Sequence, residues 1–239
     1  MLNSSVLIFL KLEYRLLLLI SLTLFSSGCM AIRPPANINV STGLVVESLS
    51  SNASLSYTVT DKSISGSGIL MYRKPDQLRV VILSPFGSVL QEVYVSGDLV
   101  TIIDPGNGIA FSGNCSDLPD KGDFSAWRYI HWVIDFDQPD YTLRDGVIAR
   151  VNKYGQSEKA VYEDGFLTSK TIADGGQVKY GKYTTVQGVP LPLEVKYETL
   201  AKEKFSILLE DPEVNAPFAE STFKPNLGKF SVYPLSVLK

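Results

Sequence analysis

An alternation of apolar and polar residues with a period of two runs through most of the chain from Leu55 onward. Between positions 193 and 198, Leu, Val and Tyr alternate with Glu and Lys, and between positions 205 and 210, Phe, Ile and Leu alternate with polar residues. Successive side chains of a strand point to opposite faces, so this pattern is typical of antiparallel strands with one buried face. The sequence therefore predicts a mainly β protein.

Short turn sequences divide this pattern at intervals of about ten residues, as expected for consecutive strands. Examples are Ser84-Pro85-Phe86-Gly87, Ser96-Gly97-Asp98 and Glu163-Asp164-Gly165. The turns delimit about eleven strands in two groups, before Gly113 and after Gln156, without an internal repeat that would indicate a propeller or a solenoid. Residues 80–83 are apolar at every position, which predicts that both faces of the sheet are covered there.

One helix is expected between the two groups of strands, over residues 123–136. Apolar residues occupy nearly all of its faces, and one face carries Phe124, Trp127, Ile130, His131 and Ile134. Such a helix must be covered on most sides. A single helix can be covered in this way if it lies across the concave side of a curved sheet. We therefore expect an antiparallel half-barrel of about eleven strands with a helical lid.

The N-terminal region has the pattern of a secretory signal peptide. Lys11 and Arg15 precede an uncharged apolar run over residues 16–25, which is too short for the roughly 20 residues that a membrane-spanning helix needs. Small residues follow and end at Cys29, which resembles the lipobox of bacterial lipoproteins. That resemblance implies acylation of Cys29 after cleavage. A plain signal peptide cut nearby and an uncleaved anchor are the alternatives.

These features divide the chain into a lipoprotein signal peptide (residues 1–28), a lipid-anchored tether (residues 29–41) and one half-barrel domain (residues 42–239). The start of the domain, residues 42–50, fits either a short helix or a strand. Met30 stands where an aspartate would favour retention in the inner membrane of enterobacteria. The resemblance therefore implies an outer-membrane anchor, with the domain facing the periplasm.

The chain offers little material for catalysis, metal binding or nucleic-acid binding. Its 22 basic and 25 acidic residues give a net charge of −3, without the basic footprint of a nucleic-acid-binding protein. The single histidine, His131, is interpreted as a core or lid residue, and Cys115 as a buried free thiol, with catalytic and redox roles as the alternatives. The sequence lacks the serine-hydrolase, zinc-protease and phosphate-loop motifs. We expect no enzyme, no cofactor and no metal.

Several segments resemble the LolA/LolB group of bacterial lipoprotein carriers. They are residues 65–79, 83–88, 100–104, 191–193, 205–207, 214–215 and 218–223. The resemblance implies an incomplete barrel with a hydrophobic cavity for acyl chains, and the lipobox places the chain closer to the membrane-anchored LolB branch. The implied function is to receive lipoproteins, from a soluble LolA-like periplasmic carrier, and to insert them into the outer membrane. A regulatory or structural periplasmic lipoprotein that binds a lipid or protein partner is the alternative.

Two sets of site residues follow from this reading. The resemblance implies that Phe86, in the loop Pro85-Phe86-Gly87, inserts into the membrane, and a phenylalanine between Pro and Gly at a hairpin tip is expected to be exposed. The cavity and lid are expected to consist of apolar strand and helix residues: Val80, Ile82, Val93, Val95, Trp127, Ile130, Ile134, Leu193, Val195, Phe205, Ile207 and Leu209.

Overall fold

The computed structural model describes residues 44–59, 62–122, 124–136 and 145–238. All of them belong to one compact unit, Asn37–Lys239. The signal peptide, Cys29 and the tether lie outside the described residues. No helix in the described part of the chain is both long enough and apolar enough to span a bilayer.

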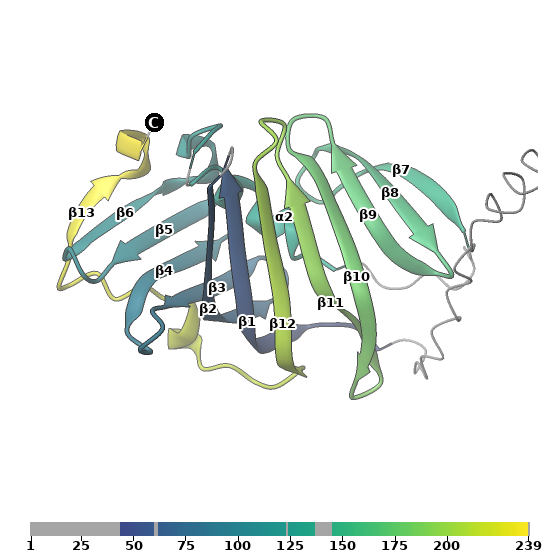
Figure 1. Cartoon of the computed structure of the whole chain (residues 1–239), viewed down its shortest axis with the longest axis horizontal. Coiled ribbons are helices and arrows are strands. Elements are labelled where there is room, and N and C mark those ends of the chain that lie inside the picture. The colour runs from purple at the N-terminus through teal and green to yellow at the C-terminus, as the bar shows by residue number, and fades with distance from the viewer. Residues whose placement is uncertain (1–43, 60–61, 123, 137–144, 239) are drawn as a thin grey trace, which may run out of the picture. The chain divides into compact units, whose positions relative to one another are not determined.

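Thirteen strands within the described ranges form one large open sheet (Figure 1). They are β1 (Ser48–Val59), β2 (Lys62–Arg73), β3 (Gln77–Leu83), β4 (Val89–Ser96), β5 (Leu99–Asp104), β6 (Ile109–Asn114), β7 (Gly146–Val151), β8 (Ser157–Glu163), β9 (Phe166–Ile172), β10 (Gly176–Val186), β11 (Val189–Glu198), β12 (Lys204–Val214) and β13 (Ser231–Pro234). Their order across the sheet is β13-β6-β5-β4-β3-β2-β1-β12-β11-β10-β9-β8-β7. β13 pairs with β6 in parallel, and the other neighbours are antiparallel.

The predicted fold class is confirmed, with two strands more than the alternation indicated. β7 was not predicted, because its valines at 147 and 151 are exposed and so reverse the usual pattern of buried apolar residues. β13 was not predicted, because all four of its residues are exposed and show no alternation in burial. Of the two interpretations of residues 42–50, the strand holds for the described part, since β1 begins at Ser48 and no helix covers residues 44–47.

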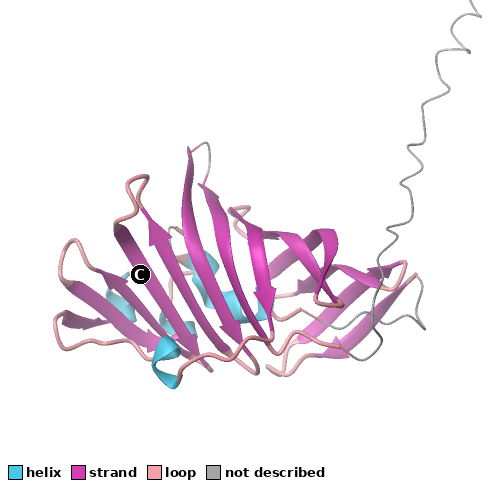
Figure 2. Cartoon of the chain, turned by 90° about the horizontal axis from the view of Figure 1, so that it is seen from below, coloured by secondary structure: helices cyan, strands magenta, loops and turns pink. Residues whose placement is uncertain are grey.

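The expected continuous helix over residues 123–136 is wrong in form, although its position is right. The structure has a 3-10 turn, η2 (Ser125–Tyr129), followed by a single α-helical turn, α2 (Ile130–Val133). Further 3-10 turns are η1 (Cys115–Asp117), η3 (Glu220–Phe223) and η4 (Leu235–Leu238). We call residues 124–136 the helical segment. Figure 2 shows the strands bending around the centrally placed helical turns.

The main hydrophobic core lies between the concave face of the sheet and the helical segment, of which Ile130 and Val133 are fully buried. A smaller core lies on the opposite face, where Leu227 and Phe230 pack against Tyr94, Ile103 and Ala110. Val80 and Val81, which are consecutive in β3 and so point to opposite faces, are 1% and 6% exposed. This burial confirms for that pair that both faces of the sheet are covered.

Candidate functional site

An apolar pocket of about 580 Å³ opens between the neighbouring ends of β1 to β4 and the helical segment. Its apolar and aromatic lining includes Leu55, Tyr57, Ile82, Leu83, Phe124, Ala126, Trp127 and, from β12, Phe205. The residues described as lining it carry no formal charge. The volume falls within the range of roughly 300–1,000 Å³ that is usual for small-molecule sites. The pocket can therefore shelter an apolar chain, and its lining offers no charged side chain to pair with a charged ligand.

Two aromatic rings and a glycine shape the pocket. The rings of Trp127 and Phe205 contact each other with centroids 5.6 Å apart. Gly66 lines the wall, and a Cβ atom added to it would have only the Leu83 carbonyl oxygen, at 3.7 Å, within contact range. At Gly68 a Cβ atom would lie 2.4 Å from the Val81 carbonyl oxygen, so the close approach of β3 requires glycine there. The free space of the pocket thus borders Gly66 and ends before Gly68.

Pro85, Phe86 and Gly87 form the tip of the loop between β3 and β4. Ser84 closes the turn, because its carbonyl accepts a hydrogen bond from the Gly87 N–H at 2.9 Å and its Oγ accepts one from the Ser88 N–H at 3.0 Å. Gly87 has a φ of 80°, which a residue with a side chain adopts only with strain. This tight turn leaves the Phe86 side chain 96% exposed, while Pro85 lines the pocket.

The structure places the expected cavity and lid residues on the concave side, in and around a single core. Ile82, Trp127 and Phe205 line the apolar pocket. The residues that are buried in the packed core are Val80, Val93, Val95, Ile130, Ile134, Val195, Ile207 and Leu209. Leu193 is partly buried and packs against that core. The expected cavity residues that border free space therefore lie at the apolar pocket, beside β1–β4 and the helical segment.

Polar side chains hold the start of the helical segment against the sheet. Glu203 is 5% exposed and accepts hydrogen bonds from the Gly122 N–H, at 2.7 Å, and from the Ser125 hydroxyl. The Tyr57 hydroxyl donates to the Gly122 carbonyl oxygen at 2.5 Å. These bonds fix the turn that precedes Phe124 and Trp127, so they position one wall of the pocket.

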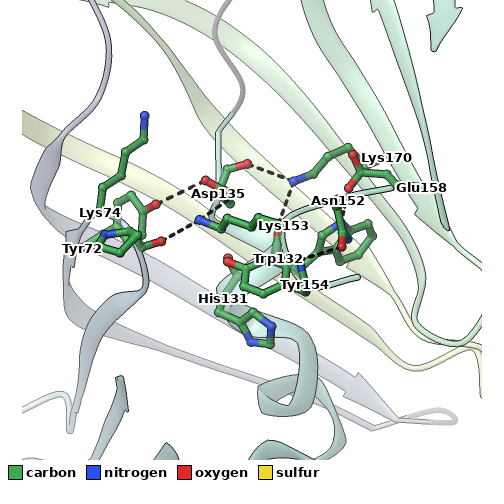
Figure 3. Close-up of polar contacts among 12 residues, drawn as sticks. Tyr72, Lys74, His131, Trp132, Asp135, Asn152, Lys153, Tyr154, Glu158 and Lys170 are labelled. Atoms are coloured by element: carbon green, nitrogen blue, oxygen red, sulfur yellow. Dashed lines mark hydrogen bonds and ion pairs between the residues drawn. The ribbon is translucent and has the colours of Figure 1, made fainter. Parts of the chain in front are cut away.

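A buried lysine holds the other end of the segment (Figure 3). Lys170 is 1% exposed, and its ammonium donates to the carbonyl oxygens of Trp132, at 2.8 Å, and Asp135, at 2.9 Å. The Tyr180 hydroxyl donates to the Val133 carbonyl oxygen at 2.8 Å. A cation is favourable at this end of a helical turn, where carbonyl groups lack main-chain partners.

Glu158 completes this polar region. It is 3% exposed and accepts hydrogen bonds from the Trp132 indole N–H and from Arg150 Nε, the latter at 2.8 Å. Lys170, Glu158 and Glu203 were not predicted as functional or structural residues from the sequence. A signal existed for the first two, because both stand at inward-facing positions of the alternation, next to Ile172 and Ala160 along their strands. A charge at such a position indicates a buried partner.

His131, in the helical segment, lies beside Cys115 of η1. The Cys115 Sγ is 4.0 Å from His131 Nδ1, and the imidazole packs edge-on against the Tyr154 ring with centroids 4.3 Å apart. Burial lowers the pKa of His131 to about 4 and raises the pKa of Cys115 to about 11. Both groups are therefore neutral at pH 7, unlike the ion pair of a cysteine nucleophile. In the described ranges no cluster of side chains is suited to hold a metal ion.

The buried histidine predicts that acid destabilises the fold. A His131 pKa near 4, against about 6.5 in the unfolded chain, gives stability that is present above pH 6.5 and lost as the pH falls toward 4. We expect the free energy of unfolding to be about 2 kcal/mol lower at pH 5 than at pH 7.5. Urea unfolding at several pH values measures this. The His131→Gln variant should lose most of the slope between pH 6.5 and 5, and an unchanged slope would contradict the assignment.

Comparisons with known proteins agree with this architecture. The family model of the outer membrane lipoprotein LolB matches residues 48–211. A DUF1329 family protein from Desulfovibrio piger superposes with a TM-score of 0.59 at 10% identity, over 75% of this chain and 90% of that one. A LolA superfamily protein from Nitrosomonas europaea gives 0.53 at 10% identity, over 76% and 92%. At these identities the superpositions show a shared fold, and no curated protein sequence matches the chain.

Proposed function

Because the chain belongs to the LolB family of outer membrane lipoproteins, we propose that it receives the acyl chains of lipoproteins in the apolar pocket and releases them into the outer membrane. The family is one of lipoprotein receptors and not of enzymes. The observation that carries the proposal is the uncharged pocket of about 580 Å³ between β1–β4 and the helical segment. The neutral Cys115–His131 pair accords with a function in which no bond is made or broken.

The energetics of acyl chains explain why such a pocket is needed. Each methylene group moved from apolar surroundings into water costs about 0.8 kcal/mol, so a free acyl chain does not cross the periplasm unaided. A receptor must offer apolar surface comparable to that of the carrier that delivers the chain. The aromatic and aliphatic wall around Trp127 and Phe205 supplies such a surface. We propose a soluble, LolA-like periplasmic protein as the donor.

Anchoring at Cys29 is part of the same proposal. A single acyl chain binds a membrane only marginally, whereas several chains hold a protein there stably. The triacylated cysteine that the lipobox implies would therefore keep the domain at the membrane surface, facing the periplasm. Mass spectrometry of the N-terminal peptide tests this anchor, and an unmodified Cys29 in the membrane-extracted protein would exclude it.

A second candidate function is favoured by the packing of the interior. Val93, Val95, Ile207 and Leu209 are 3% exposed or less, so much of the concave face is filled by the protein's own side chains. Such a filled face suits a regulatory or structural lipoprotein. The two functions differ in whether an acylated cargo is accepted.

A transfer assay distinguishes them. A form that begins at residue 30 keeps all thirteen strands and is mixed with a lipoprotein loaded on its periplasmic carrier. Under the receptor proposal the cargo moves to this form in a complex that gel filtration separates. Cargo that stays on the carrier would support the regulatory or structural function instead.

Replacing the exposed loop residue should uncouple delivery from binding. We expect Phe86→Glu to accept cargo normally but to deliver it to vesicles about tenfold more slowly or worse, because a charge replaces an apolar side chain that lipid would cover. Delivery is measured by flotation of the cargo with vesicles. Val147→Glu, at a position that is 55% exposed on β7, is the matched control and should deliver normally. Normal delivery by Phe86→Glu would remove this loop from the mechanism.

A further inference from the structure

Exposed apolar side chains from separate elements surround the entrance of the pocket. Ile64 on β2 is 68% exposed, and Leu90 on β4 is 53% exposed. Ile64 and Leu90 also line the pocket, as does Pro85, which precedes the exposed Phe86. We call Ile64, Phe86 and Leu90 the rim patch. The mouth of the pocket lies within it.

The size and chemistry of the rim patch separate it from ordinary surface. β2 and β4 are two positions apart in the sheet, and the register places Ile64 three to four residues beyond the level of Leu90 along the strands. The two residues therefore stand roughly 15 Å from each other across the entrance. Single exposed apolar residues are common on soluble proteins, but a cluster that borders an apolar pocket marks a site of interaction. The patch is therefore wider than the one loop tip that carries Phe86.

The inference rests on the proposed function and extends it to the geometry of release. We propose that the whole rim patch docks on the lipid bilayer, so that the pocket opens directly into the hydrocarbon region. An acyl chain then leaves the pocket between Ile64 and Leu90 without crossing water. Release in this geometry avoids the exposure of methylene groups that makes a free acyl chain costly in water.

Two observations favour a bilayer as the occupant over a protein. First, interfaces between proteins combine an apolar centre with hydrogen-bonding partners, whereas the pocket and its rim offer uncharged and largely apolar side chains. Second, the lipid anchor proposed at Cys29 permits this contact. β1 is roughly 40 Å long. Leu44 lies just before its first residue, Ser48, whereas Ile64 lies beside the other end of the strand. Residues 29–43 can span up to roughly 50 Å, enough for the rim patch to reach the bilayer that holds the anchor.

Spin labels on the full lipidated chain test the proposal. Cys115 is replaced by serine, and single cysteines at 64, 86, 90 and 147 carry a nitroxide in vesicles of phosphatidylethanolamine and phosphatidylglycerol. Oxygen, which concentrates in lipid, and a water-soluble nickel chelate then compete for collisions with each label. We expect the ratio of oxygen to nickel collisions at positions 64, 86 and 90 to exceed that at 147 several-fold.

The outcomes separate this inference from its rivals. Lipid contact at 86 alone would overturn it in favour of insertion by one loop tip. Labels that stay in water at all positions would overturn it, as would labels at 64 and 90 that become shielded only when the carrier protein is added. Binding of a fluorescent acyl probe by the same chains is measured in parallel. Absent binding with lipid contact intact would refute the proposed function while leaving the membrane-docking surface in place.

Discussion

Gly66→Phe will abolish most acyl-chain binding without weakening the fold. Gly66 lines the pocket, and a Cβ atom added there has only the Leu83 carbonyl oxygen, at an ordinary contact distance, within 4 Å. A phenylalanine at this position occupies the space that an acyl chain would fill, and strands tolerate aromatic residues better than glycine. We expect the affinity for a fluorescent fatty acid to fall at least about tenfold, the loss of one buried apolar contact or more.

Two neighbouring substitutions control for this effect. Gly66→Ala adds one methyl group and should leave both affinity and stability nearly unchanged. Gly68→Ala places a Cβ atom 2.4 Å from the Val81 carbonyl oxygen, so it should destabilise the fold by about 1–3 kcal/mol. Binding by Gly66→Phe at the wild-type affinity, with its thermal transition unchanged, would show that acyl chains bind elsewhere.

Glu203→Ala will destabilise the protein more than any surface substitution. The carboxylate accepts hydrogen bonds from the Gly122 N–H and the Ser125 hydroxyl in a buried position, and removing it leaves both donors without that acceptor. Two lost bonds to a charged group correspond to about 2–4 kcal/mol, allowing for partial rearrangement. For a chain of this size, this loss lowers Tm by roughly 5–15 °C in calorimetry.

Glu198→Ala, at the end of β11, is the matched control. Its carboxylate pairs with Lys202 at 3.0 Å on the surface, and such a pair contributes about 0–1 kcal/mol. Glu203→Gln keeps one acceptor oxygen and should lose about half as much stability as Glu203→Ala. Equal stability of the two alanine variants would show that Glu203 does not hold the helical segment.

The alternation of side chains was sufficient to predict the sheet, because burial of one face imposes a period of two. Val195 and Ile207 illustrate this, since both point inward and are 2% exposed or less. The same logic failed at β7 and β13, whose exposed residues follow no such rule. The sequence pattern also did not predict that the helical segment divides into a 3-10 turn and a single α-helical turn. Its carbonyl groups bond to Lys170 and Tyr180, which are distant in sequence.

The location of the pocket could be predicted only in part. The sequence predicts which side chains share a strand face, such as Val93 with Val95, but it does not identify which face is concave. Whether space remains between them depends on how side chains from distant segments meet. Val93 is fully covered, whereas the Trp127–Phe205 contact at the β1–β4 end leaves a pocket open. The rim patch has the same origin, because it joins Ile64 to residues of another hairpin.

Site-specific photocross-linking during transfer measures the central claim most directly. A photoreactive phenylalanine analogue is placed at Ile82, inside the pocket, and in a second variant at Lys196, which is exposed on the opposite face of the sheet. A lipoprotein with radiolabelled acyl chains is then supplied on its carrier and irradiated. The account predicts label transfer to the variant at position 82 and none at 196. Label at 196, or at neither position while the cargo is transferred, would contradict it.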